Sequence, residues 1–208
     1  LDIEQGSRWL IRGDSGAGKT TFMKALAGIW QYGEGKISLP DCNMLFLPQE
    51  SYMPLGTLRT ALCYPEPIES FSDTDCCEVL NKCGLKQYIS HLDDDDVLWN
   101  KKMSPGEKQR LAFARTLLLR PDYLFMDEAT SALDSISEKK IQDAIDPLIA
   151  TRTSILIAHR LSTILAADEI LVLKEGKIVE KGQHKDLVKQ GGVYTELYET
   201  QFSKALEI

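Results

Sequence analysis

The sequence predicts an α/β fold with a mainly parallel sheet as its core, a helical subdomain and a peripheral antiparallel hairpin. Three observations lead to this prediction. Short apolar runs at residues 9–12, 44–47, 123–126 and 154–158 are typical of buried parallel strands. Residues from about 51 to 119 contain no such run and instead have helical patterns, which indicates an insertion into the sheet domain. A glycine-rich loop at residues 13–20 separates the first strand from a helix.

Residues 13–20 fit the pattern G-x-x-x-x-G-K-[ST] of a phosphate-binding loop. Backbone N–H groups of such a loop, together with the N-terminus of the helix at residues 21–27, favour bound phosphate. Lys19 can reach the β- and γ-phosphates, and the Thr20 hydroxyl can ligate Mg²⁺. A chance glycine-rich turn is the alternative, and the flanking strand and helix argue against it. We expect nucleoside triphosphate binding at Gly13, Asp14, Ser15, Gly16, Ala17, Gly18, Lys19, Thr20 and Thr21.

Further elements follow in chain order. A glycine-rich turn after the first helix leads to an expected strand at 37–39. Ser104, Pro105 and Glu107 are typical of a helix start, with an N-cap, a first-turn proline and a capping box. A helix over 135–150 is expected to turn Ile136, Ile141, Ile145 and Ile149 inward. The remaining predicted elements are helices at 57–62, 73–83, 162–167, 184–189 and 193–205, and a hairpin of 169–173 with 177–180.

Polar residues follow several of the predicted strands. Asp127 and Glu128 end the run at 123–126, where Asp127 can hold Mg²⁺ and Glu128 can polarise an attacking water. A solvated strand end is the alternative, but a phosphate loop in the same chain favours the catalytic interpretation. Gln49 and His159 follow two other strands, and the carboxyl ends of such strands carry ligand-binding groups. Taken singly, each of these two is more often structural.

Composition excludes several function classes. The net charge of −7 over 208 residues argues against a nucleic-acid partner. The apolar runs are too short to span a bilayer. The five cysteines include no C-x-x-C pair, which argues against a metal site built from cysteines. The chain begins at Leu1 in what reads as the approach to the first strand, so we expect a fragment or excised domain.

The helix start at Ser104 is a second anion-binding feature. It is either only a capping box, which the spacing favours, or it meets the phosphate of another molecule's nucleotide. Trp9 and Trp30 are available to stack on a base, although core packing is the favoured role for both.

These motifs together resemble the ATP-binding domain of an ABC transporter over nearly the whole chain. Residues 103–107 stand at the family's Leu-Ser-Gly-Gly-Gln signature, with Pro105 in place of one glycine. Residues 131–134 resemble the D-loop. Gln49, the pair Asp127 and Glu128, and His159 match the Q-loop, the Walker B pair and the switch histidine. Residues 129–134, 157–163 and 191–197 resemble exporter-type half-transporters. Residues 47–49 and 52–59, with Trp99 before the signature, are also similar to the peroxisomal fatty-acyl half-transporters and their bacterial relatives.

The resemblance implies a P-loop NTPase of ABC type that binds ATP and Mg²⁺ between two nucleotide-binding domains. Glu128 would be the general base, supported by His159, while Thr20, Gln49 and Asp127 would serve the metal. The residues that would contact the other copy's ATP or cross the dimer interface are Ser104, Gly106, Glu107 and Asp134. A transmembrane domain, expected in the same full-length polypeptide, would be driven at the cytoplasmic face of a plasma or inner membrane.

The family's base-stacking aromatic and an N-terminal strand would lie before Leu1. The single domain 1–208 would thus lack both, with its helical subdomain at about 51–119. Three other functions stay open: a non-transport ABC ATPase, a nucleotide-binding regulatory module without turnover, and a small-molecule kinase. The transported substrate, the direction of transport and the identity of the second half are not encoded in these motifs.

Overall fold

The structure, a computed structural model, describes residues 1–158 and 161–202 of the chain. Its contacts divide the chain into two compact units. The first unit contains Leu1–Phe46, Tyr123–Glu128 and the residues from Arg152 onward. The second contains Leu47–Asp122 and Ala129–Thr151.

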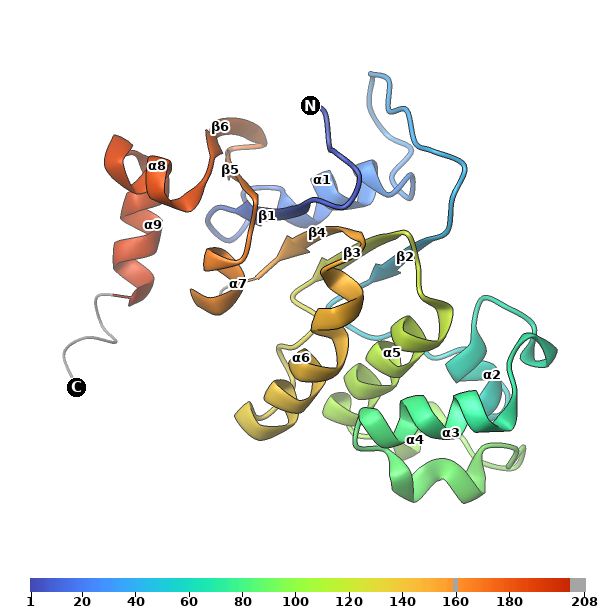
Figure 1. The fold of residues 1–208 in the computed structure, drawn as a ribbon. Coiled ribbons are helices and arrows are strands. Elements are labelled where there is room, and N and C mark those ends of the chain that lie inside the picture. The colour runs from blue at the N-terminus through green and yellow to red at the C-terminus, as the bar shows by residue number, and fades with distance from the viewer. Residues whose placement is uncertain (159–160, 203–208) are drawn as a thin grey trace. The chain divides into compact units, whose positions relative to one another are not determined.

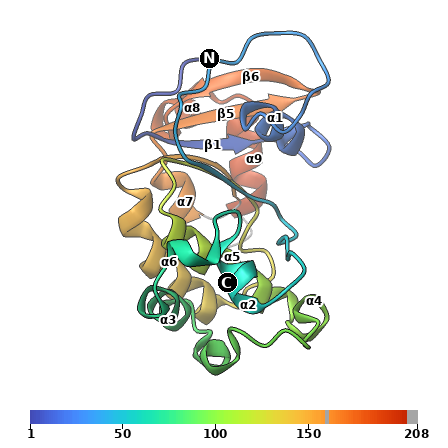
Figure 2. The ribbon, with the colours of Figure 1, turned by 90° about the vertical axis from the view of Figure 1, so that its right-hand side faces the viewer.

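A six-stranded sheet has the strand order β2-β3-β4-β1-β5-β6 (Figure 1). The strands are β1 (Arg8–Arg12), β2 (Met44–Leu47), β3 (Tyr123–Asp127), β4 (Thr153–Ile157), β5 (Glu169–Lys174) and β6 (Lys177–Gly182). The β3–β4, β4–β1 and β1–β5 pairs are parallel, whereas β5 and β6 form an antiparallel hairpin beside β1 (Figure 2). The predicted fold class, a mainly parallel sheet with a peripheral hairpin, is confirmed.

Alternate residues of β1 face opposite sides of the sheet, as a period of two requires. Trp9 and Ile11 pack in one apolar cluster with Met23 of helix α1 (Lys19–Leu26). Leu10 packs in the other cluster. That second cluster is completed by residues of α7 (Leu161–Leu165), α8 (His184–Gln190) and α9 (Val193–Phe202). Burial on both faces explains why Trp9, Leu10 and Ile11 of β1 are apolar in succession and do not alternate with polar residues.

The second unit is built from helices packed around α5 (Pro105–Leu119). Its other helices are α2 (Leu58–Cys63), η1 (Ile68–Ser70), α3 (Asp73–Lys82), η2 (Lys86–His91), α4 (Trp99–Lys102) and α6 (Ser135–Ile149). Leu111 and Phe113 of α5 are buried, and α2, α3 and α6 all contact this helix. On the rim of the unit, Arg59 forms ion pairs with Asp73 and Asp93.

The predicted strand at 37–39 is wrong, because the structure has no strand there. A strand needs a neighbour for its N–H and C=O groups, and no ladder partner for this segment occurs among the described residues. Ile37 and Leu39 are 49% and 40% exposed, so burial does not stabilise an extended segment either.

Two predicted core positions are also wrong. Ile136 is 73% exposed, because a spacing of five residues puts it about 140° around α6 from Ile141. Trp30 is 43% exposed and stacks edge-on against Tyr32, whereas Trp9 is buried as expected. In the described part of the chain, no helix combines the length and apolar character that a membrane span requires.

Candidate nucleotide site

The backbone of the loop at residues 13–20 depends on glycine at two points. Gly13 has φ 147°, and a Cβ at this position would collide with the carbonyl oxygen of Leu173 in β5. Gly18 has φ 93° and forms the N-cap of α1. L side chains rarely adopt either conformation. The first helix therefore begins directly at Lys19, two residues earlier than the sequence pattern predicts.

The hairpin of β5 and β6 supports this loop from one side. The N–H of Gly176, at the tip of the hairpin, donates to the carbonyl of Ala17 at 3.1 Å. Within the loop, the N–H of Ala17 donates to the carbonyl of Asp14, also at 3.1 Å. The loop is thus fixed by contacts with the hairpin as well as by its own turn.

The Lys19 side chain folds back over the start of the loop. Its Nζ donates to the carbonyl of Gly13 at 2.9 Å and to that of Asp14 at 2.8 Å. A lysine ammonium has three donors and no acceptor, so it can hold these carbonyls and still interact with an anion. Loop residues on the solvent side are Asp14, Ser15, Gly16, Thr20 and Thr21. The donor set and the glycine cradle fit the phosphates of a nucleotide, and the exposed Thr20 hydroxyl fits a hard cation.

The register of the sheet puts Asp127 on the edge from which this loop emerges. Asp127 of β3 pairs with Ile157 of β4, which in turn pairs with Ile11 of β1. Since neighbouring strands are about 4.8 Å apart, Asp127 lies about 10 Å across the sheet from the end of β1. The residue is 5% exposed. A buried carboxylate and the phosphate loop therefore share one edge of a single rigid sheet.

Glu128 leaves the strand in a left-handed conformation, with φ 48°. Its N–H donates to the carbonyl of Ile157 at 3.0 Å, which fixes the turn. Residues other than glycine in this conformation are uncommon and cluster at functional sites. Sequence patterns contain no signal for this backbone feature.

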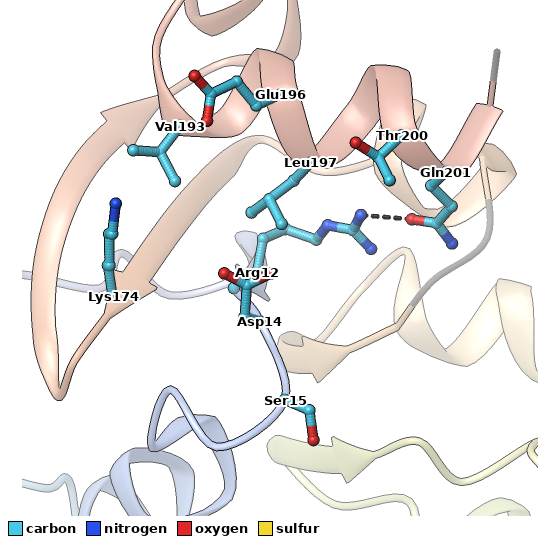
Figure 3. Close-up of a pocket in the computed structure, with 10 residues that line it drawn as sticks. Arg12, Asp14, Ser15, Lys174, Val193, Glu196, Leu197, Thr200 and Gln201 are labelled. Carbon is cyan, nitrogen blue, oxygen red and sulfur yellow. Dashed lines mark hydrogen bonds between the residues drawn. The ribbon is translucent and has the colours of Figure 1, made fainter.

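A pocket of about 380 Å³ opens between the loop and helix α9 (Figure 3). Its lining includes Asp14 and Ser15 of the loop, and Glu196 and Thr200 of α9. Arg12, at the end of β1, closes one side by donating to the side-chain carbonyl of Gln201. Figure 3 shows the Arg12 side chain reaching under α9 toward Gln201.

Arg12 also donates from Nη1 to the carbonyl of Ala158 at 2.8 Å. Burial lowers the pKa of its guanidinium from the ordinary value. From the sequence alone, Arg12 is only the last residue of a predicted strand. In the structure it links the end of β1 to the carbonyl end of β4 and to α9.

In the second unit, the predicted capping box at the start of α5 is confirmed. The Ser104 Oγ accepts from the Glu107 N–H at 3.3 Å, and the Ser104 N–H donates to Glu107 Oε2 at 2.9 Å. Pro105 occupies the first turn. Ser104 remains exposed at the tip of the helix, with the helix dipole behind it.

Glu107 is further held by Tyr88, whose hydroxyl donates to Oε1 at 2.8 Å. Burial acts to raise the pKa of Glu107, but hydrogen bonds from the Ser104 N–H, Tyr88 and the Ser104 hydroxyl outweigh it and lower the pKa. The carboxylate is therefore a stable charged part of the helix cap.

In the structure, Asp134 is the N-cap of α6. Its Oδ1 accepts from the N–H groups of Ile136 at 3.1 Å and Ser137 at 3.0 Å. A hydrogen bond from the Ser137 side chain, followed by these N–H bonds, lowers the pKa of Asp134. Gln49 is exposed, and its carbonyl accepts from Gln109 of α5 at 3.3 Å. His159 lies outside the described residues.

Gln109 is a buried polar residue that the sequence analysis did not single out. It precedes buried Phe113 by four residues, so its place on the inner face of α5 could have been seen from the helical period. Its side chain connects the segment at Gln49 to that at 131–132 within the second unit.

The sheet topology and the loop together define a P-loop α/β protein. The sequence matches the ABC transporter family over residues 1–131, and the chain belongs to this family. It is 38% identical over 84% of its length to an uncharacterized ABC transporter ATP-binding protein of Haemophilus influenzae. It is 35% identical over 97% of its length to an ATP-dependent lipid A-core flippase of Colwellia psychrerythraea.

Among solved structures, a bacterial Atm1-family ABC exporter with ATP bound is similar, with a TM-score of 0.80 and 32% identity over 97% of this chain. The chain spans about a third of the length of these proteins: 29% and 36% of the two relatives, and 38% of the exporter chain. The family and fold inferred from the motifs are therefore confirmed.

Proposed function

We propose that this chain is the nucleotide-binding domain of an ABC exporter, and that it binds ATP with Mg²⁺ and hydrolyses it to power transport across a membrane. The observation that carries the proposal is the shared sheet edge, where the phosphate loop follows β1 and the pair Asp127 and Glu128 follows β3. Hydrolysis of a phosphoanhydride requires phosphate contacts, a metal carboxylate and a residue that orients water.

Roles follow from this arrangement. Loop N–H groups and Lys19 bind the β- and γ-phosphates. Thr20 and Asp127 would hold Mg²⁺, whose positive charge would offset the negative charge of the phosphates. Glu128, the residue that follows Asp127 at this sheet edge, accepts the proton of the attacking water, as a carboxylate positioned as a general base can. Gln49 adds a metal contact, and His159 a hydrogen bond to the γ-phosphate. These last two roles rest on the family resemblance.

Two copies are required for the complete site. Each phosphate loop meets the Ser104 helix tip of the other copy, with Gly106 and Glu107 shaping that tip and Asp134 at the interface. Exposure of Ser104 and of the loop supports this, because both surfaces are accessible to a second copy. Pro105 removes one N–H from the tip, but it also suits the first helical turn. The partner driven by this dimer is a transmembrane domain, with ATP bound at the cytoplasmic face.

Steady-state ATP hydrolysis by the purified protein that carries this chain tests the proposal. Glu128→Gln should lower kcat at least about a hundredfold while ATP binding is retained, and Lys19→Ala should weaken binding itself. Matched controls are Glu175→Gln, another glutamate with positive φ, and Lys24→Ala, a lysine in the last turn of the same helix. Full turnover in Glu128→Gln would contradict the assigned base. Retained binding without any turnover in the wild type would instead indicate a regulatory module.

A further inference from the structure

Gln109 of α5 is 3% exposed, and both the nitrogen and the oxygen of its side-chain amide form hydrogen bonds. Its Nε2 donates to the carbonyl of Gln49 at 3.3 Å and to the Ser131 hydroxyl at 3.2 Å. Its Oε1 accepts from the N–H of Ala132 at 2.9 Å. One buried side chain therefore bonds two segments that are far apart in the sequence.

These bonds require a group that donates at one end and accepts at the other. The carbonyl of Gln49 can only accept and the N–H of Ala132 can only donate, which fixes the orientation of the amide. An apolar side chain of similar size satisfies neither partner. A carboxylate satisfies Ala132 but not Gln49. Glutamine is therefore specified by its surroundings, not only by the space available.

The second link between α5 and the same loop is a close backbone approach. A Cβ on Gly106 would lie 3.0 Å from the carbonyl oxygen of Ala132. The first two turns of α5 thus contact the loop at 131–134 at two points, Gly106 and Gln109. A displacement of either segment must therefore also displace the other, because packed protein interiors do not deform freely.

We propose that Gln109 is a positioning residue that makes the Gln49 segment, the 131–134 loop and the signature helix move as one body. The inference rests on the proposed function, because each of the three segments carries a residue assigned there to the nucleotide site: Gln49, Asp134 and Ser104. Gln109 is buried, so it acts through these segments and not on the nucleotide directly. It transmits a change at any one of the three segments to the other two.

Hydrogen exchange on the protein without nucleotide tests the junction directly. In Gln109→Met the Ala132 amide loses its acceptor, so its exchange should accelerate by about fivefold, the factor that one net hydrogen bond represents. In Gln109→Glu the acceptor remains, so protection at Ala132 should persist although the donor to Gln49 is lost. A role in packing alone would not separate these two variants in this way.

Hydrolysis provides the second measurement. If the three segments act together, both variants should lower kcat about tenfold with little change in KM, because the interaction serves the reacting state more than ATP binding. Thr116→Val is the matched control: Thr116 is fully buried on the same helix, and its hydroxyl donates to the carbonyl of Ala112, within that helix, at 2.9 Å. It should change neither kcat nor exchange at Ala132.

Unchanged Ala132 exchange in Gln109→Met would overturn the proposal, as would an unchanged kcat in both variants of a hydrolysing protein. If the wild type does not hydrolyse ATP, the proposed function fails, and the exchange comparison alone decides whether the junction exists.

Discussion

Replacing Gly13 by alanine should destabilise the first unit by more than the same change at Gly16. Gly13 has φ 147° and no room for a Cβ, which would collide with the Leu173 carbonyl. Strained backbone costs about 1–3 kcal/mol, and overpacking costs about 1–3 kcal/mol more. The expected total of about 2–6 kcal/mol is a large part of the roughly 5–15 kcal/mol that stabilises a typical domain.

Gly16→Ala is the matched control within the same loop. Gly16 has φ 80°, but nothing lies within 4 Å of an added Cβ, so only the backbone term of about 1–2 kcal/mol applies. Urea unfolding, followed by the fluorescence of buried Trp9 in β1, measures both variants. Equal losses in the two variants would refute the argument that the β5 carbonyl restricts the loop.

Three further predictions concern the second unit. Gly106→Ala should cost about 1–3 kcal/mol in urea unfolding, because its Cβ would press on the Ala132 carbonyl at 3.0 Å; a loss under about 0.5 kcal/mol would contradict this. Hydrogen bonds that outweigh burial lower the pKa of Glu107 below its ordinary value, so its stabilisation is present above the unfolded-state pKa and is lost as pH falls through the folded-state pKa. The stability gap between wild type and Glu107→Gln should therefore close in acid, and a constant gap would be inconsistent with the capping role. Arg115→Met should cost about 1–3 kcal/mol by leaving the buried Ala61 carbonyl without its donor, measured against wild type in the same assay.

The sheet and the phosphate loop were predictable because each depends on local chemistry. A buried strand is continuously apolar, the loop needs glycine at fixed positions, and the capping box at Ser104 has a fixed spacing. The hairpin across Glu175 and Gly176 was predictable for the same reason, and both residues have positive φ.

Other features depend on long-range contacts that no local pattern contains. Residues 37–39 look like a strand but have no ladder partner among the described residues. The left-handed backbone of Glu128 is fixed by a bond to Ile157, a residue of a different strand. Gln109 gains its partners only when Gln49 and Ser131 approach α5. The structure describes where each site residue proposed from the sequence lies, except for His159. The roles of all these residues remain predictions.

The most direct test of the central claim is light scattering on Glu128→Gln with and without ATP and Mg²⁺. If the phosphate loop of one copy and the Ser104 helix tip of another bind the same ATP, the variant should shift from monomer to dimer when ATP and Mg²⁺ are added. The double variant Glu128→Gln with Ser104→Arg, which blocks the tip, should remain a monomer. A monomer in both cases, under conditions where Glu128→Gln binds ATP, would contradict the shared site.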